Sequence, residues 1–406
     1  MEECLLSALP SSVTTAALSG SRQHAEARPL HILTLTPFYP SVEDPSQGSF
    51  VQEPLLATER IGIRNRVIAV QPFYRTPAHA AEHEVPGAWQ KYFSVPGNSG
   101  LALTGEFLAA ALARQVARLH AQRPFDLIHA HAPLPCGRAA AMLSRRLQIP
   151  FVVSVHGLDA FAERQAGPLW GRWCRRKSAH VYGTASAVIC VSQKVANQIA
   201  HCPGAKPSVI YNGVDANLFS PQFEAAPLTV LSVGNLIPTK GHALLLHAFA
   251  QAAVSLPDCR LEIVGDGPER NRLEILANKL GIAGRVSFMG RLHREAVADA
   301  VRRCAVFALP SWYEGLGCVY LEAMSSAKPA IGCAGQGIDE IIENGKNGIL
   351  VSPGSLEELS SALRALLLNP DFRIRMGTAA RATILHRHTL DHQAVQLSQL
   401  YRECVA

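Results

Sequence analysis

The chain has 406 residues, of which 48% are hydrophobic and 17% are charged, a composition typical of a folded globular protein and not of a disordered or fibrous one. Its length exceeds what one hydrophobic core supports and predicts two domains of about 180 residues each. The formal net charge of +6 does not by itself indicate a nucleic-acid-binding protein, and the sequence has no run of about eighteen uncharged apolar residues that would predict a membrane span.

The N-terminal segment, the cysteines and the histidines bear on compartment and cofactors. Residues 1–28 lack both a basic start and a long apolar stretch, which argues against a secretory signal, so we expect a disordered tail. The ten cysteines include no C-x-x-C pair, as is typical of reduced thiols in a cytoplasm. The pairs His129/His131 and His386/His388 have chelating spacing but no evident carboxylate or thiol partner, so we expect no metal site.

Apolar strand-like runs alternate with amphipathic segments of helix length from residue 29 to residue 210. Helices are expected at 105–120 and 134–147, among others. The alternation predicts a first domain over this range. Its strands are predicted at 30–35, 66–70, 125–129, 151–155, 187–191 and 208–210.

A turn-rich linker at 211–227 separates this alternation from a second one at 228–385. A final helical segment, 386–406, is expected to pack back toward the first domain. Strand–helix alternation is the signature of parallel sheets wrapped by helices, so we predict an α/β protein with two Rossmann-like, doubly wound domains facing across a cleft. The strands of the second domain are predicted at 228–233, 261–264, 286–289, 305–309, 330–333 and 348–351.

In such sheets ligands bind beyond the carboxyl ends of the strands, and polar residues occur at these points in the first domain. Gly48 begins a helix after the first strand. His131 and His156 each follow a later strand, and Asp159 lies just beyond. These residues are candidates for one wall of the cleft.

Three loops of the second domain follow its first three strands. The first contains Lys240 just before a helix, where its ammonium could meet a phosphate. The second has the pattern G-x-G without the rest of a dinucleotide-binding fingerprint. The third offers backbone groups that could meet a base. The loops are Gly234–Gly241, Gly265–Gly267 and Met289–Gly290.

The most informative segment is 311–324, which places Glu314 and Glu322 eight positions apart around a turn between a buried strand and a helix. Gly315 and Gly317 let backbone amides approach a ligand closely. The first amides of the helix lack intrahelical partners and carry the positive end of the helix dipole. The segment therefore predicts a diphosphate-binding turn, in which Glu322 could accept hydrogen bonds from ribose hydroxyls.

Each candidate also has an ordinary structural explanation. A lysine before a helix, such as Lys240, is often a solvated surface charge, and a histidine after a strand is often a structural hydrogen-bonding residue. Glu314 and Glu322 could be a loop acid and an acid that complements the helix dipole. The functional interpretation depends on convergence of these residues on one cleft.

From about Leu30 to its end, the sequence resembles the retaining GT-B glycosyltransferases of the GT4 type. Segments 39–51 and 318–324 are similar to the subgroup that builds teichuronic acid and other exopolysaccharides. The motifs in the family's order and spacing are the linker 212–215, the Lys240–Gly241 loop, the 265–268 turn and the E-x7-E segment from Glu314 to Glu322.

This resemblance implies metal-independent transfer of a sugar, with retention at the anomeric carbon, from a nucleoside diphosphate sugar to a hydroxyl group, without a cofactor. It implies that Glu322 holds the ribose, that Glu314 contacts the donor sugar, and that Lys240 and two loop amides hold the diphosphate. The catalytic candidates are Glu314, His156 and Lys240. The donor-binding candidates are Gly48, Asn235, Lys240, Gly265, Gly267, Met289, Gly290, Glu314, Gly315, Leu316, Gly317 and Glu322. The acceptor-side candidates are His131, His156 and Asp159.

One position departs from the family pattern, which usually has an arginine where this chain has Asn235. Arginine would offer the diphosphate a bidentate fork that asparagine lacks. Either Lys240 and the helix dipole suffice, or another cation such as Arg291 substitutes, or the enzyme is weak.

Residues 170–177 combine two tryptophans with four cations and suggest how an acceptor is reached. This patch could touch anionic lipid beside a lipid-linked saccharide, at the inner face of the plasma membrane. The alternative is a solvated helix face that packs its tryptophans inward. Two other functions stay open, a phosphorylase or epimerase on the same architecture and a noncatalytic sugar-nucleotide-binding protein.

Overall fold

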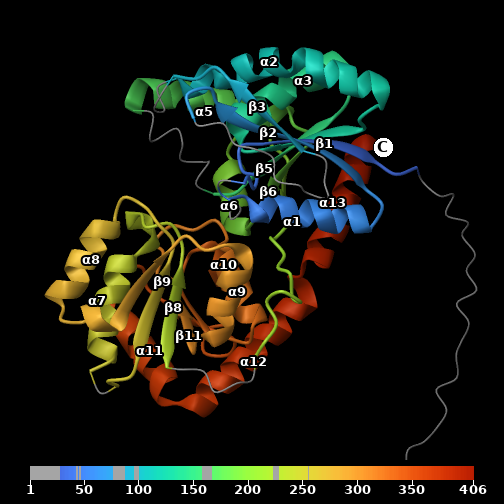
Figure 1. Cartoon of the computed structure of the whole chain (residues 1–406). Coiled ribbons are helices and arrows are strands. Elements are labelled where there is room, and N and C mark those ends of the chain that lie inside the picture. Colours follow the sequence, from blue (N-terminus) through green and yellow to red (C-terminus); the bar gives the residue numbers. More distant parts are fainter. Residues whose placement is uncertain are drawn as a thin grey trace, which may run out of the picture.

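The computed structural model describes residues 28–42, 44, 47–75, 87–95, 100–157, 167–222, 228–254 and 256–406. Within these ranges the chain forms two α/β domains, which lie one above the other in Figure 1. Most of the expected N-terminal tail, residues 1–27, and the candidate Asp159 lie outside the described residues.

The first domain is built on a seven-stranded sheet in the order β3-β2-β1-β4-β5-β6-β7, in which every neighbouring pair is parallel. Its central strands are mostly apolar and are buried along their whole length, because helices cover both faces. The strands are β1 (His31–Thr36), β2 (Arg64–Pro72), β3 (Gly87–Tyr92), β4 (Leu127–His131), β5 (Phe151–Val155), β6 (Ala187–Cys190) and β7 (Pro207–Val209). The helices are α1 (Ser49–Arg60), α2 (Leu101–Gln122), η1 (Pro133–Gly137), α3 (Arg138–Leu147), α5 (Gly167–Thr184) and α6 (Gln193–Ile199).

Two elements of this domain differ from the sequence prediction. Strand β3 was not predicted. Among the described residues it lies at the sheet edge and pairs with β2 alone, and its mixed sequence lacks a clear apolar run. The segment predicted as one helix at 134–147 is a short π-helical turn, η1, followed by the α-helix α3. Pro133 and Pro135 do not support a regular first turn of an α-helix.

The second domain has a six-stranded parallel sheet in the order β10-β9-β8-β11-β12-β13. Ser355 begins its helix α11 by accepting a hydrogen bond from the amide of Glu358. The strands are β8 (Thr229–Val233), β9 (Arg260–Val264), β10 (Val286–Gly290), β11 (Val306–Ala308), β12 (Ala330–Cys333) and β13 (Ile349–Val351). The helices are η3 (Pro238–Lys240), α7 (His242–Ala252), α8 (Arg270–Lys279), η4 (Ala283–Arg285), α9 (Arg294–Arg303), α10 (Cys318–Ser325), η5 (Gly337–Glu340), α11 (Leu356–Leu368) and α12 (Pro370–Arg387).

The last helix, α13 (Leu390–Val405), packs against the first domain, as the red ribbon in Figure 1 shows. Tyr401 and two leucines of α13 belong to a buried cluster with residues of β1 and β4. Beside it, Val214 of the linker forms a β-bridge with Thr389, so the two chain crossings between the domains run side by side. Among the described residues, no helix is long and apolar enough to cross a bilayer.

Candidate active site

The glycine-rich loop between β11 and α10 touches the first domain directly. A Cβ atom on Gly315 would lie 2.3 Å from the carbonyl oxygen of His156, so only glycine fits there. On the other side, Gly157 has φ 113°, a conformation that favours glycine, and its Cβ would lie 2.8 Å from the Cα of Gly315. The carboxyl ends of β11 and β5 therefore meet, as expected for two sheets that face across a cleft.

Further contacts hold this loop against the first domain. Ser192 donates its hydroxyl to the carbonyl oxygen of Gly315 at 2.8 Å, and Tyr313 donates to the carbonyl oxygen of Gly157 at 3.0 Å. The Nζ atom of Lys194 donates to the carbonyl oxygen of Gly335 at 2.8 Å. The domains are thus in a closed arrangement at this side of the boundary.

Glu314 and Lys240 form a nearly buried ion pair. Their side chains are 11% and 13% exposed, and the ammonium contacts the Oε2 atom of the carboxylate. The backbone amide of Glu314 donates to the Oε1 atom of Gln336 at 3.0 Å, which orients the loop. Lys240 was predicted to be a point cation ready for a phosphate; in the structure its charge is shared with Glu314.

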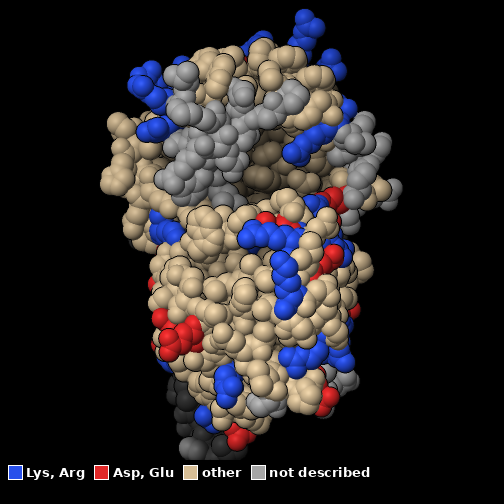
Figure 2. All heavy atoms as spheres, turned by 90° about the vertical axis from the view of Figure 1, so that its left-hand side faces the viewer, with Lys and Arg blue, Asp and Glu red and all other residues tan. Residues whose placement is uncertain are grey.

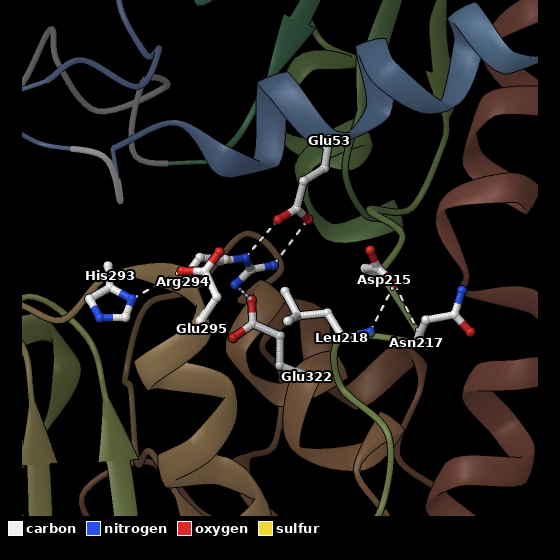
Figure 3. A network of polar contacts seen from close by, with 8 residues as sticks. All are labelled: Glu53, Asp215, Asn217, Leu218, His293, Arg294, Glu295 and Glu322. Atoms are coloured by element: carbon white, nitrogen blue, oxygen red, sulfur yellow. Dashed lines mark hydrogen bonds and ion pairs between the residues drawn. The ribbon is translucent and has the colours of Figure 1, made fainter. Parts of the chain in front are cut away.

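Glu322 lies in α10, is 2% exposed and pairs with Arg294, the first residue of α9. Figure 3 shows Arg294 between Glu322 below it and Glu53, which reaches down from α1 of the first domain. Neither Arg294 nor Glu53 was predicted from the sequence. A charge at a helix start or on a helix face is too common to identify either one.

The ends of β8, β9 and β10 approach one another through glycines. A Cβ atom on Gly265 would lie 2.0 Å from the carbonyl oxygen of Gly234, and one on Gly267 would lie 2.5 Å from that of Leu236. The amide of Gly265 donates to the carbonyl oxygen of Gly290 at 2.8 Å. The next side chain back along β10, Met289, is 41% exposed. This wall presents backbone groups and one flexible apolar side chain.

Asn235, where the family usually has arginine, is exposed and brings no positive charge to this wall. Arg291, the suggested substitute, forms a 2.5 Å ion pair with Asp44 of the first domain and is 58% exposed. Figure 2 shows blue and red side chains side by side where the upper and lower parts of the molecule meet. The cations near the cleft are therefore largely paired with carboxylates.

Three histidines of the first domain, His129, His131 and His156, stack on one another beside the cleft. The rings of His131 and His156 lie 5.2 Å apart and parallel within 3°, and their Nδ1 and Nε2 atoms are 3.0 Å apart. Burial lowers the pKa of His156 to about 4 and that of His129 to about 3, so both are neutral near pH 7. His131 is only 5% exposed and lies behind His156, although both were expected to face the cleft.

Gly48 precedes α1 with φ 78°, and a Cβ atom there would lie 2.4 Å from the carbonyl carbon of Phe38. Phe50, two residues later, packs its ring edge-on against His156 at 4.9 Å. Gly48 therefore places α1 beside the His156 wall. Among the described residues, no group of three His, Cys, Asp or Glu side chains is arranged to hold a metal ion.

Two family models match the chain, glycosyltransferase family 4 over residues 59–218 and glycosyl transferases group 1 over residues 214–383. An uncharacterised glycosyltransferase of Methanocaldococcus jannaschii is 30% identical over 254 residues, which are 62% of this chain and 68% of that protein. The chain belongs to the group 1 glycosyltransferases. This confirms the resemblance that the sequence motifs indicated.

Other relatives agree with this membership. TuaC of Bacillus subtilis, a glycosyltransferase named for teichuronic acid biosynthesis, is 27% identical over 82% of this chain and 88% of its own. Anabaena HepE, solved in complex with UDP and glucose, superposes with a TM-score of 0.72 and 22% identity, covering 92% of this chain and all of its own (100%). This similarity supports the predicted GT-B fold for this glycosyltransferase.

The two family models meet at the linker, and each covers part of the candidate site. Lys240, Arg294 and the two carboxylates of the E-x7-E segment lie within the group 1 match. His131 and His156 lie within the family 4 match, whereas Gly48 and Glu53 precede it. The candidate site of this glycosyltransferase therefore draws on both matched ranges and on residues that precede them.

Proposed function

We propose that this glycosyltransferase moves a sugar from a nucleoside diphosphate sugar to a hydroxyl group of a saccharide or lipid-linked saccharide, with retention at the anomeric carbon. The observation that carries the proposal is the position of loop 309–317, which lies against the first domain. Its Glu314 pairs with Lys240, it leads into the amides that begin α10, and it lies opposite the neutral His156. Similarity to TuaC supports a role in assembling a cell-surface polysaccharide.

The donor would lie with its diphosphate at the start of α10. Leu316 and Gly317 stand at the helix start, where backbone amides and the helix dipole favour an anion. Lys240 would supply the fixed positive charge, and Glu322, further along the same helix, would accept hydrogen bonds from the ribose. The complex of HepE with UDP supports a uridine nucleotide as the first donor to test.

The reaction forms a bond between the acceptor oxygen and the anomeric carbon and breaks the bond from that carbon to the β-phosphate oxygen. The acceptor's proton passes to the departing diphosphate on the same face of the sugar. Charge builds up on the leaving group, so Lys240 and the helix amides would provide the main stabilisation. Glu314, already paired with Lys240, would position the sugar and not attack it.

A thermal-shift screen with UDP, GDP, ADP and their sugars tests the donor assignment, followed by a transfer assay in EDTA. We expect UDP or a UDP sugar to raise the melting temperature, because a ligand that binds only the folded state stabilises it. We also expect transfer to persist in EDTA, since Lys240 would replace a metal ion. Stabilisation by none of the nucleotides would contradict the proposal, and binding without any turnover would favour the noncatalytic alternative.

We further propose that the first domain touches an anionic membrane, where a lipid-linked acceptor would be found. Trp170 and Trp173 of α5 are 42% and 36% exposed and stack on each other at 5.7 Å, so they are not packed fully inward. Lys177 lies 5.9 Å from the ring centre of Trp173. Figure 2 views the molecule from the side on which α5 lies in Figure 1, and in its upper part the coloured side chains are mainly Lys and Arg.

Flotation with liposomes tests this contact. We expect the protein to float with vesicles that contain anionic lipid and not with neutral ones, because several cations near the surface each add roughly 1 kcal/mol of attraction. The double variant Trp170→Ser, Trp173→Ser should lose most of this binding. Ile374→Ser, which alters an exposed apolar residue of the other domain, should not. Equal flotation with both kinds of vesicle would exclude the proposal.

A further inference from the structure

We propose that Arg294 is a positioning residue that holds Glu322 ready for the donor ribose, and that Glu53 extends this support across the domain boundary. The inference rests on the proposed function, in which Glu322 binds the ribose. It adds two residues, one from each domain, to the donor site. It also makes donor binding depend on the closed arrangement of the domains.

The geometry of Arg294 is that of a fixed bridge (Figure 3). Its Nε and Nη2 atoms donate to the two carboxylate oxygens of Glu53 at 2.6 and 3.0 Å, a bidentate fork. Its Nη1 atom donates to the Oε1 atom of Glu322 at 2.5 Å. The side chains of Arg294, Glu53 and Glu322 are only 19%, 17% and 3% exposed, so solvent screens these contacts weakly.

The second carboxylate oxygen of Glu322 is the atom that could bind the ligand. Its Oε2 atom is buried and has no hydrogen-bond partner among the described residues. A buried carboxylate oxygen without a hydrogen-bond partner costs free energy, so we expect a ligand group that donates a hydrogen bond to it. A ribose hydroxyl at this point would satisfy that oxygen while Arg294 keeps the other one in place.

The surroundings of Arg294 show why this position requires arginine. The guanidinium lies 4.6 Å from the ring centre of Phe219, a fully buried residue of the linker. Burial alone would lower the pKa of Arg294, but Glu322 and Glu53 outweigh this effect and raise it. A lysine would keep the charge but lose the bidentate fork to Glu53.

The bridge also links the donor site to domain closure. Glu53 belongs to α1 of the first domain, whereas Arg294 and Glu322 belong to the second. Opening the domains would withdraw Glu53 and leave Arg294 with one carboxylate, so Glu322 would be held less firmly. A donor that needs an ordered Glu322 would therefore favour the closed form.

Isothermal titration with UDP, 2′-deoxy-UDP and 3′-deoxy-UDP tests this role. We expect wild-type protein to bind at least one deoxy nucleotide at least tenfold more weakly than UDP. In Arg294→Gln, we expect UDP to bind at least tenfold more weakly and the difference between UDP and the deoxy nucleotides to disappear. Arg294→Lys and Glu53→Gln should show part of the same change. Glu295→Gln, the neighbouring exposed acid that contacts His293, should behave like wild type.

The outcomes separate the two proposals. If wild-type protein binds neither UDP nor another nucleoside diphosphate of the thermal-shift screen, or if neither the ribose hydroxyls nor Glu322→Gln affects binding, the donor assignment fails and takes the inference with it. The ribose hydroxyls and Glu322 can affect the affinity for UDP while Arg294→Gln, Arg294→Lys and Glu53→Gln all leave the preference for UDP over its deoxy analogues unchanged. In that case the inference alone fails. Tighter binding of UDP by Arg294→Gln would show that the arginine blocks the site, and would also overturn the inference. The lysine and Glu53 variants keep the test valid if Arg294→Gln does not fold.

Discussion

Replacing Glu314 by glutamine is expected to lower the transfer rate at least a hundredfold, which corresponds to about 2.7 kcal/mol in the activation free energy. Glutamine keeps the shape and the hydrogen-bonding reach of the side chain but removes the charge that holds Lys240. The lysine would then lose its fixed position relative to the diphosphate, and the donor sugar would lose a carboxylate contact. Initial rates at saturating donor give the measurement.

The fold should survive Glu314→Gln, because the amide of residue 314 still donates to Gln336. A cooperative melting curve would confirm this, with a melting temperature below that of wild type because Lys240 loses its charged partner. Glu343→Gln is a matched control, since Glu343 pairs with Lys346 on the surface, where their side chains are 62% and 68% exposed. Near-normal turnover by Glu314→Gln would rule out the assignment of the site.

Replacing Lys240 by alanine is expected to lower transfer by a similar factor and also to weaken UDP binding. The ammonium pairs with Glu314 in the loop that leads into α10, where the proposal places the diphosphate, and the exposed Asn235 offers no replacement. The variant should also be less stable, since removing one partner of a buried ion pair leaves an uncompensated charge, at a cost of about 3 kcal/mol. Rates, UDP titration and thermal melting measure the three effects.

A double variant separates stability from catalysis at this pair. Lys240→Ala combined with Glu314→Gln removes the uncompensated carboxylate, so its melting temperature should recover most of the loss while its activity stays low. Lys279→Ala, at an exposed position on α8, should match wild type in all three measurements. Normal transfer by Lys240→Ala would show that another group stabilises the leaving diphosphate.

The parts of the molecule that could be predicted are those with local sequence signals. A buried parallel strand such as β6 is a continuous apolar run, Ala-Val-Ile-Cys, and is visible in the sequence. Glu314 and Glu322 are eight positions apart on either side of one turn, so their spacing in the sequence is enough to predict that they lie close to the same turn. Strand β3 has no such run, and in the part of the chain that the structure describes it is an edge strand.

The polar partners of the site could not be predicted in the same way. Arg294 and Glu53 are 241 positions apart, and each looks like an ordinary charge on a helix until the fold brings them together. Lys240 and Glu314 were both predicted as site residues, but their ion pair joins positions 74 apart and depends on the relative placement of β8 and β11. Sequence spacing located the residues, whereas their pairing is a property of the tertiary structure.

The return of α13 to the first domain has a consequence for how the chain is made. Leu397, Leu400 and Tyr401 complete a core cluster whose other members lie in the first 210 residues, and Tyr401 contacts His129 at 2.7 Å. A ribosome that has just synthesised β7 has therefore produced every strand of the first sheet but not the helix that seals it. During synthesis of the second domain this apolar surface stays uncovered, and the first domain reaches its final packing only after the last helix leaves the exit tunnel.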